Sequence, residues 1–233
     1  MIAFANAKLN IGLQVINRRE DGYHNLETVF YPLKLYDIVE VVEAPDMGFF
    51  PSGLAIPGDG ADNLCLRAYR RLAEDFDLPP VHIYLHKVIP VGAGLGGGSA
   101  DAAFLLKLLN DQFQLGLSEP ELVGYARRLG ADCAFFIRNA PVLATGIGDI
   151  FQAVPVDLSR YHIVVVKPNI HVATAVAYGM VKPNKSGRQL ASAIQLPVAS
   201  WRGRIFNDFE TGIFAKHPEI GAVKTRLYEQ GAI

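Results

Sequence analysis

The alternation of apolar and polar residues changes its period several times along the chain, and each change marks a boundary between predicted elements. A period of two residues is typical of strands with one buried face, and it predicts strands at 2–16, 26–35, 37–43 and 81–89. Apolar residues three and four positions apart predict helices at 63–76, 102–113, 119–130, 208–214 and 219–230. Asp62 is placed to cap the first helix, and Ser118 with Glu121 forms a capping box for the third.

The pattern becomes weaker after residue 130. Residues 131–137 form a tight apolar segment that predicts a strand or a turn, and 140–155 predicts a glycine-containing loop. Four consecutive β-branched residues at 163–166 predict a buried strand at the start of a second lobe. We therefore expect a boundary near residue 150, which gives domains 1–150 and 151–233.

Composition and charge narrow the class of protein. Half of the 233 residues are hydrophobic, and the formal net charge of −1 comes without the basic stripe typical of nucleic-acid binding. The two cysteines, Cys65 and Cys133, form no C-x-x-C pair, which fits a reducing compartment. The chain begins without a signal-like segment, and its apolar runs are too short to span a bilayer. These features predict a cytoplasmic protein that binds neither nucleic acid nor a membrane.

The most informative segment joins the strand at 81–89 to the helix at 102–113. It reads Pro-Val-Gly-Ala-Gly-Leu-Gly-Gly-Gly-Ser-Ala-Asp over residues 90–101, with five glycines among the seven residues 92–98. Each glycine costs conformational entropy on folding, so an ordinary turn would use fewer. Backbone N–H groups at a helix N-terminus bind phosphate, and missing side chains let the backbone approach it. The segment therefore predicts a nucleotide phosphate site.

Two common phosphate motifs match this loop only in part. Residues 92–97 match G-x-G-x-x-G, but a dinucleotide fingerprint also requires a second strand after the helix, and here a second helix is predicted. A P-loop requires a lysine where Gly98 stands. An NAD(P)-dependent oxidoreductase and a Walker A protein are therefore disfavoured. A flexible turn without any ligand is the remaining structural alternative.

The loop resembles the phosphate-binding motif of the GHMP kinases, and other short motifs resemble that family in the same order along the chain. These motifs lie at 7–10 (Ala-Lys-Leu-Asn), 21–26 (Asp-Gly-Tyr-His-Asn-Leu), 62–64 (Asp-Asn-Leu), 129–133 (Leu-Gly-Ala-Asp-Cys), 146–149 (Gly-Ile-Gly-Asp) and 207–210 (Asn-Asp-Phe-Glu). The resemblance implies an α+β, two-lobed fold with helices packed on one side of mixed sheets. It implies an N-terminal domain for ATP binding and catalysis and a C-terminal domain on the substrate side. The family normally continues into a Ser/Gly-rich segment near residue 233, so we expect a truncated C-terminal domain.

The resemblance also implies a phosphotransferase that uses ATP and Mg²⁺ and has an alcohol as acceptor. The Asp-Gly-Tyr-His segment is similar to the cytidine site of the member that phosphorylates the 2-hydroxyl of a cytidine-diphosphate-linked sugar alcohol, in non-mevalonate isoprenoid synthesis. Ser99 is a candidate Mg²⁺ ligand and equally a candidate helix N-cap. The implied ATP-binding residues are Asn63, Pro90, Val91, Gly92, Ala93, Gly94, Leu95, Gly96, Gly97, Gly98, Ser99 and Ala100.

Two charged residues are the catalytic candidates. The resemblance makes Asp132 the base that takes the hydroxyl proton, whereas its sequence context alone favours a carboxylate in a helix-terminal turn. Lys8 lies in an apolar strand, where an ammonium group is costly unless it is paired. Paired with Asp132, it could stabilise charge that develops during phosphoryl transfer. The alternative is an edge-strand lysine that points to water.

Five residues are candidates for binding the acceptor. By resemblance, Tyr23 stacks on cytosine, His24 contacts its polar edge, and Tyr178 forms a second aromatic wall. Asn10, two residues after Lys8, could hydrogen-bond the substrate, and Thr174 could donate to a phosphate. Each also has an ordinary structural interpretation, which is the favoured one for Thr174.

Two alternative functions follow from these motifs. A GHMP kinase for another small alcohol, such as homoserine or mevalonate, would share the loop but would need no aromatic residues for a base. A catalytically inactive nucleotide-binding module is disfavoured by the presence of both Lys8 and Asp132.

Overall fold

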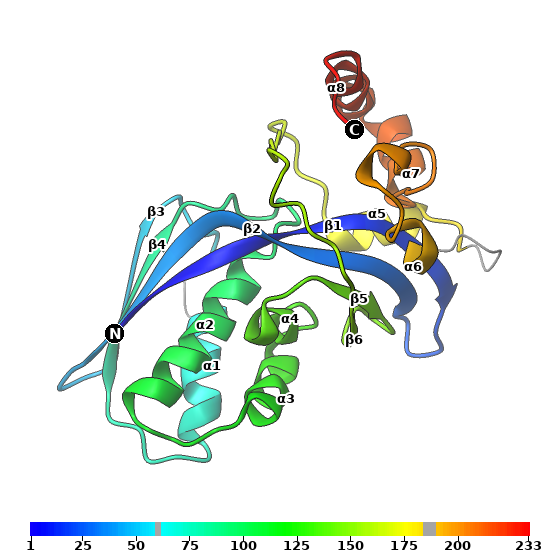
Figure 1. The fold of residues 1–233 in the computed structure, drawn as a ribbon. Helices are drawn as coiled ribbons and strands as arrows, with labels where there is room; N and C mark the ends of the chain where they lie inside the picture. The colour runs from blue at the N-terminus through cyan, green and yellow to red at the C-terminus, as the bar shows by residue number, and fades with distance from the viewer. Residues whose placement is uncertain (59–61, 184–189) are drawn as a thin grey trace. The chain divides into compact units, whose positions relative to one another are not determined.

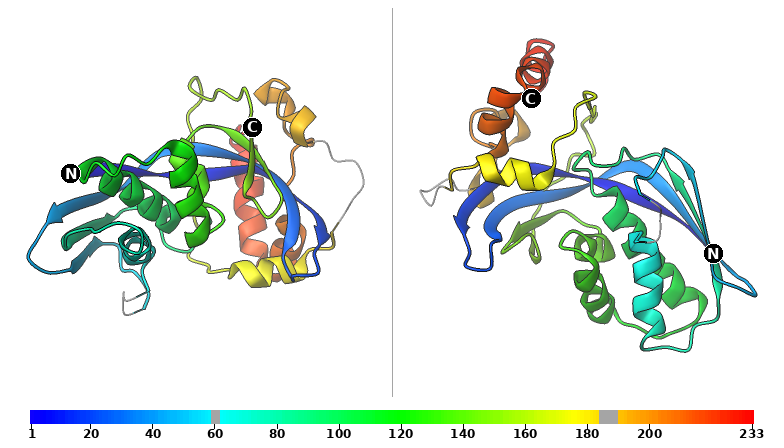
Figure 2. Two further views of the ribbon diagram at one scale, coloured as in Figure 1. Left: turned by 90° about the horizontal axis from the view of Figure 1, so that it is seen from below. Right: turned by 180° about the vertical axis from the view of Figure 1, so that it is seen from behind.

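A computed structural model describes residues 1–58, 62–183 and 190–233 (Figures 1 and 2). It consists of two compact units, each built from two stretches of the chain. Unit 1 comprises Met1–Leu9 with Pro32–Ala140, and unit 2 comprises Asn10–Tyr31 with Pro141–Ile233. This differs from the expected division at residue 150, because the two long strands β1 (Ile2–Arg18) and β2 (His24–Glu43) contribute residues to both units.

Unit 1 is a mixed sheet with helices on one side (Figure 1). Its strands follow the order β3-β4-β2, and β1 pairs with β2. β3 (Gly48–Gly53) runs parallel to β4 (Val81–Lys87), which runs antiparallel to β2. The helices are α1 (Leu64–Ala73), α2 (Gly97–Gln112), α3 (Glu119–Leu129) and α4 (Cys133–Arg138).

The core of unit 1 follows from the periods of its elements. In β4, every second residue is buried, beginning at Val81 and including Ile83 and Leu85. Helix α2 is buried on most of its circumference, and its buried apolar residues are Ala100, Ala102, Ala103, Leu105, Leu106, Leu108 and Leu109. Small residues near its N-terminus let neighbouring elements approach closely. This packing fixes where α2 begins, and therefore where the preceding glycine loop lies.

Several predictions for unit 1 require correction. β2 is one continuous strand, although two were predicted, and Asp37, predicted as the first residue of the second strand, is a buried acceptor for backbone N–H groups. The residue that caps α1 is Asn63, not Asp62, since the Asn63 Oδ1 accepts from the Cys65 N–H at 2.9 Å. Residues 133–138 form helix α4, although the apolar run predicted a strand or turn. The predicted capping contact at α3 is present, because the Glu121 carboxylate accepts from the Ser118 N–H at 2.8 Å.

Unit 2 contains the β1–β2 hairpin and a second hairpin where a loop was expected. β5 (Val142–Thr145) pairs antiparallel with β2 and with β6 (Ile150–Ala153). The helical elements are α5 (Thr174–Met180), α6 (Leu190–Ala193), η1 (Val198–Ser200), α7 (Phe209–Lys216) and α8 (Pro218–Glu229). The core of this unit consists of Val29, Leu143, Val156, Leu190 and Ile194.

The predicted buried strand at 163–166 is wrong. These residues are irregular and exposed, and Val164 has a relative exposure of 76%. β-Propensity describes how well a residue fits a pleated surface, but a buried strand also needs a neighbouring strand to pair with. Across the described part of the chain, none of the helices is long and apolar enough to cross a membrane.

Candidate active site

The glycine loop lies between the end of β4 and the start of α2, and it lines a pocket of about 260 Å³. Gly96 is the N-cap of α2 and has a φ of +73°, a conformation that L side chains rarely adopt. A Cβ at this position would lie 2.8 Å from the Phe136 ring and 3.0 Å from Cγ of Lys8. The loop backbone therefore packs directly on the lysine stem, and only glycine leaves room for that approach.

Lys8 and Asp132 meet beside this loop. The Lys8 Nζ lies 3.2 Å from the Asp132 Oδ2, and the Lys8 backbone N–H donates to the Leu95 carbonyl at 2.8 Å. Lys8 is buried, with a side-chain exposure of 6%, whereas the Asp132 side chain keeps 34%. The edge-strand alternative for Lys8 is therefore wrong. A buried ammonium thus contacts a carboxylate that remains accessible to a substrate.

The structure also places Asn63 and Ser99 at the pocket. Asn63 lines the pocket while its side chain caps α1, and an ATP contact of Asn63 stays a prediction. Ser99 lies in the first turn of α2 and is not its N-cap, which is Gly96. The Ser99 hydroxyl contacts the Cys133 thiol, and burial raises the pKa of that thiol to about 11.

A buried charge cluster that the sequence did not predict lies next to the loop. The Lys87 ammonium contacts both Asp37 and Asp101, at 2.7 Å from the Asp101 Oδ2. The other Asp37 oxygen accepts from the N–H groups of Val88 and Ile89 at 2.6 and 2.8 Å. The cluster therefore joins β2, β4 and α2 at both ends of the loop. The signal in the sequence was Asp37, at the start of the β-prone run 37–43.

The carboxyl group of Asp101 titrates near neutral pH in the folded protein. Its burial raises the pKa to about 7, against the opposing effect of the Lys87 ammonium. This value lies above the ordinary 3.8. Between pH 3.8 and about 7, the Asp101 carboxyl group is therefore protonated in the folded protein and ionised in the unfolded chain. The resulting contribution to the free energy of unfolding is present at low pH and is lost as the pH rises to about 7.

We therefore expect the Tm of Asp101→Asn to change less between pH 4 and 8 than the Tm of the unmodified chain, because an amide cannot release the proton. Thermal unfolding followed by circular dichroism at several pH values measures the difference. Asp111→Asn, at an exposed position on the same helix, is the control and should follow the unmodified chain. Parallel curves for Asp101→Asn and the unmodified chain would contradict the assignment.

Unit 2 brings three aromatic rings together in a second candidate site. The His24 imidazole stacks on the Tyr178 ring, with centroids 4.9 Å apart and planes 15° apart. Tyr23, predicted with Tyr178 as one of two aromatic walls for the base, has a relative exposure of 63%. The contacts of these residues with a base stay predictions. Phe209 contacts Tyr178 edge to face at 5.0 Å.

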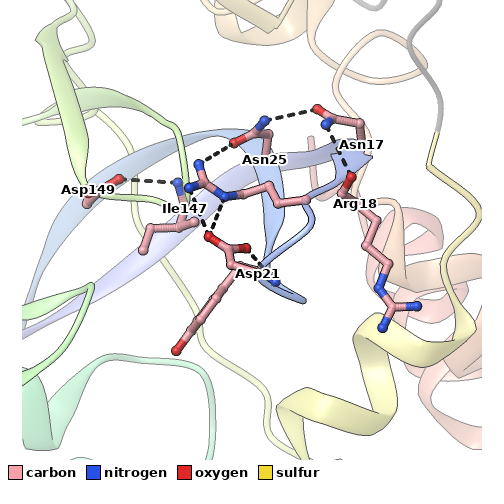
Figure 3. Close-up of polar contacts among 8 residues, drawn as sticks. Asn17, Arg18, Asp21, Asn25, Ile147 and Asp149 are labelled. Carbon is pink, nitrogen blue, oxygen red and sulfur yellow. Dashed lines mark hydrogen bonds and ion pairs between the residues drawn. The ribbon is translucent and has the colours of Figure 1, made fainter.

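The turn before these aromatic residues has its own polar contacts (Figure 3). The Asp21 carboxylate accepts from the Tyr23 N–H at 3.0 Å and from the Arg19 guanidinium at 2.9 Å. The Asn25 amide donates to the Asn17 Oδ1 at 3.1 Å, across the hairpin. These bonds fix the backbone from which Tyr23 projects into solvent.

The other two acceptor candidates also lie in unit 2. The Asn10 amide donates to the Thr28 hydroxyl at 3.0 Å, which in turn donates to the Gly12 carbonyl at 2.6 Å. Thr174 is exposed at the start of α5, one helical turn before Tyr178. Substrate contacts of both residues stay predictions.

Comparisons with known proteins agree on one family. The family model for the GHMP kinases N terminal domain matches residues 63–140. The 4-diphosphocytidyl-2-C-methyl-D-erythritol kinase of Bacteroides thetaiotaomicron is 49% identical over all of this chain and 86% of its own length. The chain belongs to this kinase family. The relative of the same name from Cytophaga hutchinsonii is also 49% identical, again over all of this chain and 86% of its own.

Solved structures support the same assignment. A crystal structure of 4-(cytidine 5′-diphospho)-2C-methyl-D-erythritol kinase has a TM-score of 0.79 and 31% identity, over 99% of this chain and 84% of that one. The structure of homoserine kinase from Cytophaga hutchinsonii has the same fold, with a TM-score of 0.65 and 15% identity. The match includes 99% of this chain and 79% of that one. The predicted GHMP kinase membership, the mixed α+β fold and the prediction of an ATP-using phosphotransferase are therefore confirmed.

Proposed function

We propose that the protein transfers the γ-phosphate of ATP to the 2-hydroxyl of 4-diphosphocytidyl-2-C-methyl-D-erythritol. The observation that carries the proposal is the buried Lys8 ammonium 3.2 Å from the accessible Asp132 carboxylate, beside a glycine loop at a helix N-terminus. Relatives that are 49–50% identical over the whole chain have the name of this kinase. The two cysteines are free, which supports a reaction in the cytoplasm.

The residues of unit 1 have distinct roles in this reaction. The Asp132 carboxylate accepts the proton of the substrate hydroxyl as the hydroxyl oxygen forms its bond to the γ-phosphorus. The bond between the γ-phosphorus and the bridging oxygen breaks, and ADP leaves with that oxygen. The Lys8 ammonium stabilises the charge that develops on the reacting oxygens. Backbone N–H groups of the glycine loop, together with the N-terminus of α2, bind the phosphates.

A magnesium ion would arrive with the nucleotide rather than occupy a site built by the protein alone. The described residues contain no cluster of three or more His, Cys, Asp or Glu side chains that could hold a metal. Mg²⁺ is commonly bound through phosphate oxygens, waters and only one or two protein groups, so such a cluster is not required. Ser99, which lines the pocket, would be its protein ligand. When bound, Mg²⁺ would neutralise part of the triphosphate charge.

The aromatic residues of unit 2 would bind the cytidine of the acceptor. The His24–Tyr178 pair offers a flat surface for a base, and the exposed Tyr23 ring is available as a second one. Asn10 and Thr174 would hydrogen-bond the remainder of the acceptor. Homoserine and mevalonate have no ring that could use this surface.

An ADP-release assay tests the proposal. We expect turnover with ATP and 4-diphosphocytidyl-2-C-methyl-D-erythritol, and no turnover when homoserine or mevalonate is the acceptor. Turnover with one of these small alcohols alone would favour the second candidate function. If ATP binds but none of the three acceptors is phosphorylated, the protein is an inactive nucleotide-binding module and the proposal is wrong.

A further inference from the structure

The Asn-Asp-Phe-Glu segment at 207–210 has no role in the function proposed above. We propose that this segment is a positioning motif. It anchors the start of α7 to β1 and holds the Phe209 ring against the Tyr178 ring. The His24–Tyr178 pair is therefore formed before the base binds. The inference rests on the proposed function in one respect, namely that the base is cytosine. Phe209 is a positioning residue, because it acts through Tyr178.

Two hydrogen bonds join the motif to β1, and a third lies within the motif. The Asp208 Oδ2 accepts from the Val15 N–H at 2.9 Å, and the Asp208 N–H donates to the Leu13 carbonyl at 2.8 Å. The Asn207 Oδ1 accepts from the Phe209 N–H at 3.0 Å at the first residue of α7. The carboxylate and the backbone N–H of Asp208 therefore tie the beginning of α7 to β1, while the Asn207 side chain holds the backbone of Phe209 at the first residue of the helix.

Three rings then lie in sequence, each supplied by a different element. Phe209 of α7 meets Tyr178 of α5 edge to face, with centroids 5.0 Å apart and planes 85° apart. Tyr178 in turn lies nearly parallel to His24 of β2. Edge-to-face and offset-stacked contacts are the favoured geometries of aromatic rings. Phe209 therefore holds the Tyr178 ring at the angle that stacks on His24.

Close approach of α7 to α5 supports the same arrangement. A Cβ at Gly212 would lie 2.6 Å from the Cβ of Met180, the last residue of α5. Gly212 is three residues after Phe209, so the two face the same side of α7. At the other end of the motif, the Glu210 carboxylate accepts from the Lys224 ammonium at 2.6 Å with both oxygens, which ties α7 to α8. Each of the four residues of the motif thus makes a separate contact.

The experiment compares Phe209→Leu with Phe214→Leu. Both residues are half-buried on α7, but only Phe209 contacts Tyr178. We expect Phe209→Leu to raise the KM for the cytidyl substrate about 3- to 10-fold, the value of one aromatic contact, with kcat and the KM for ATP within twofold. Phe209→Tyr keeps the ring and should restore the KM. Phe214→Leu should leave all three constants unchanged.

A second readout needs no substrate. The ring current of Tyr178 shifts the imidazole proton signals of His24, so NMR should show these signals moving in Phe209→Leu and not in Phe214→Leu. Unmoved His24 signals, or equal effects of the two substitutions on the KM values, would overturn the inference. If the His24 signals move as expected but the unmodified chain does not bind cytidine diphosphate, the positioning role stands and the cytidine assignment of the proposed function is wrong.

Discussion

We expect Asp132→Asn to lower kcat by about 10³-fold, which is the size of effect typical of losing a general base. Asparagine has the same shape and retains an oxygen that can accept from Lys8, but it cannot take up the hydroxyl proton. The side chain of Asp132 makes no capping bond to α4, so the substitution leaves the helix start intact. The KM for ATP should stay within twofold, because the nucleotide is bound by the loop.

Steady-state ADP release measures both constants, and Asp111→Asn is the control, since that exposed carboxylate lies at the far end of α2. Lys8→Met, alone and combined with Asp132→Asn, tests whether the base and the ammonium act together. If Lys8 and Asp132 act as one unit, the kcat of the double variant is no lower than that of the slower single variant. A kcat for Asp132→Asn within tenfold of the unmodified chain would show that another group takes the proton.

The sequence predicted those features of the site that can be recognised from neighbouring residues alone. Five glycines at the entry to an amphipathic helix indicate a close backbone approach, whatever the rest of the fold does. An ammonium group in an apolar strand is costly unless it is paired, and Lys8 lies 3.2 Å from Asp132. Both conclusions depend on the cost of an isolated feature, which can be judged from a few neighbouring residues.

The parts that the sequence did not predict depend on contacts between distant segments. Lys87 meets Asp37 across a separation of 50 residues, and no spacing rule connects an acid in one strand with a lysine in another. The run at 133–138 contains almost only apolar residues, so neither a helical nor a strand period could be recognised in it. The run at 163–166 has strong β-propensity, but it lacks a pairing strand in the described structure.

The charge cluster also changes how the missing P-loop lysine is understood. Lys87 lies close to the start of α2, since a Cβ at Gly97 would be 3.2 Å from its Nζ. Its ammonium, however, already contacts two buried carboxylates. A cation paired in this way holds the strand and the helix together, and it adds little net positive charge for a triphosphate. Lys8 remains the better candidate for electrostatic help at the reacting phosphate.

The second large effect is expected for Gly96→Ala, which should raise the KM for ATP at least about tenfold, because a non-glycine residue at positive φ costs roughly 1–3 kcal/mol. The new methyl group would also lie 2.8 Å from the Phe136 ring and 3.0 Å from the Lys8 stem. Both effects push the loop away from its present position. Because Lys8 is on the other side of the same contact, kcat should fall as well.

Gly98→Ala is the matched control for this variant, since a Cβ there meets nothing nearer than Leu64 at 3.8 Å and no positive φ is involved. Its Tm should equal or slightly exceed that of the unmodified chain, because alanine is favoured over glycine inside a helix. Titration with a non-hydrolysable ATP analogue and a thermal melt distinguish binding from folding. If Gly96→Ala binds the analogue as tightly as the unmodified chain does, the loop does not bind the phosphates through its backbone, and the glycines serve only the packing of α2 against Lys8.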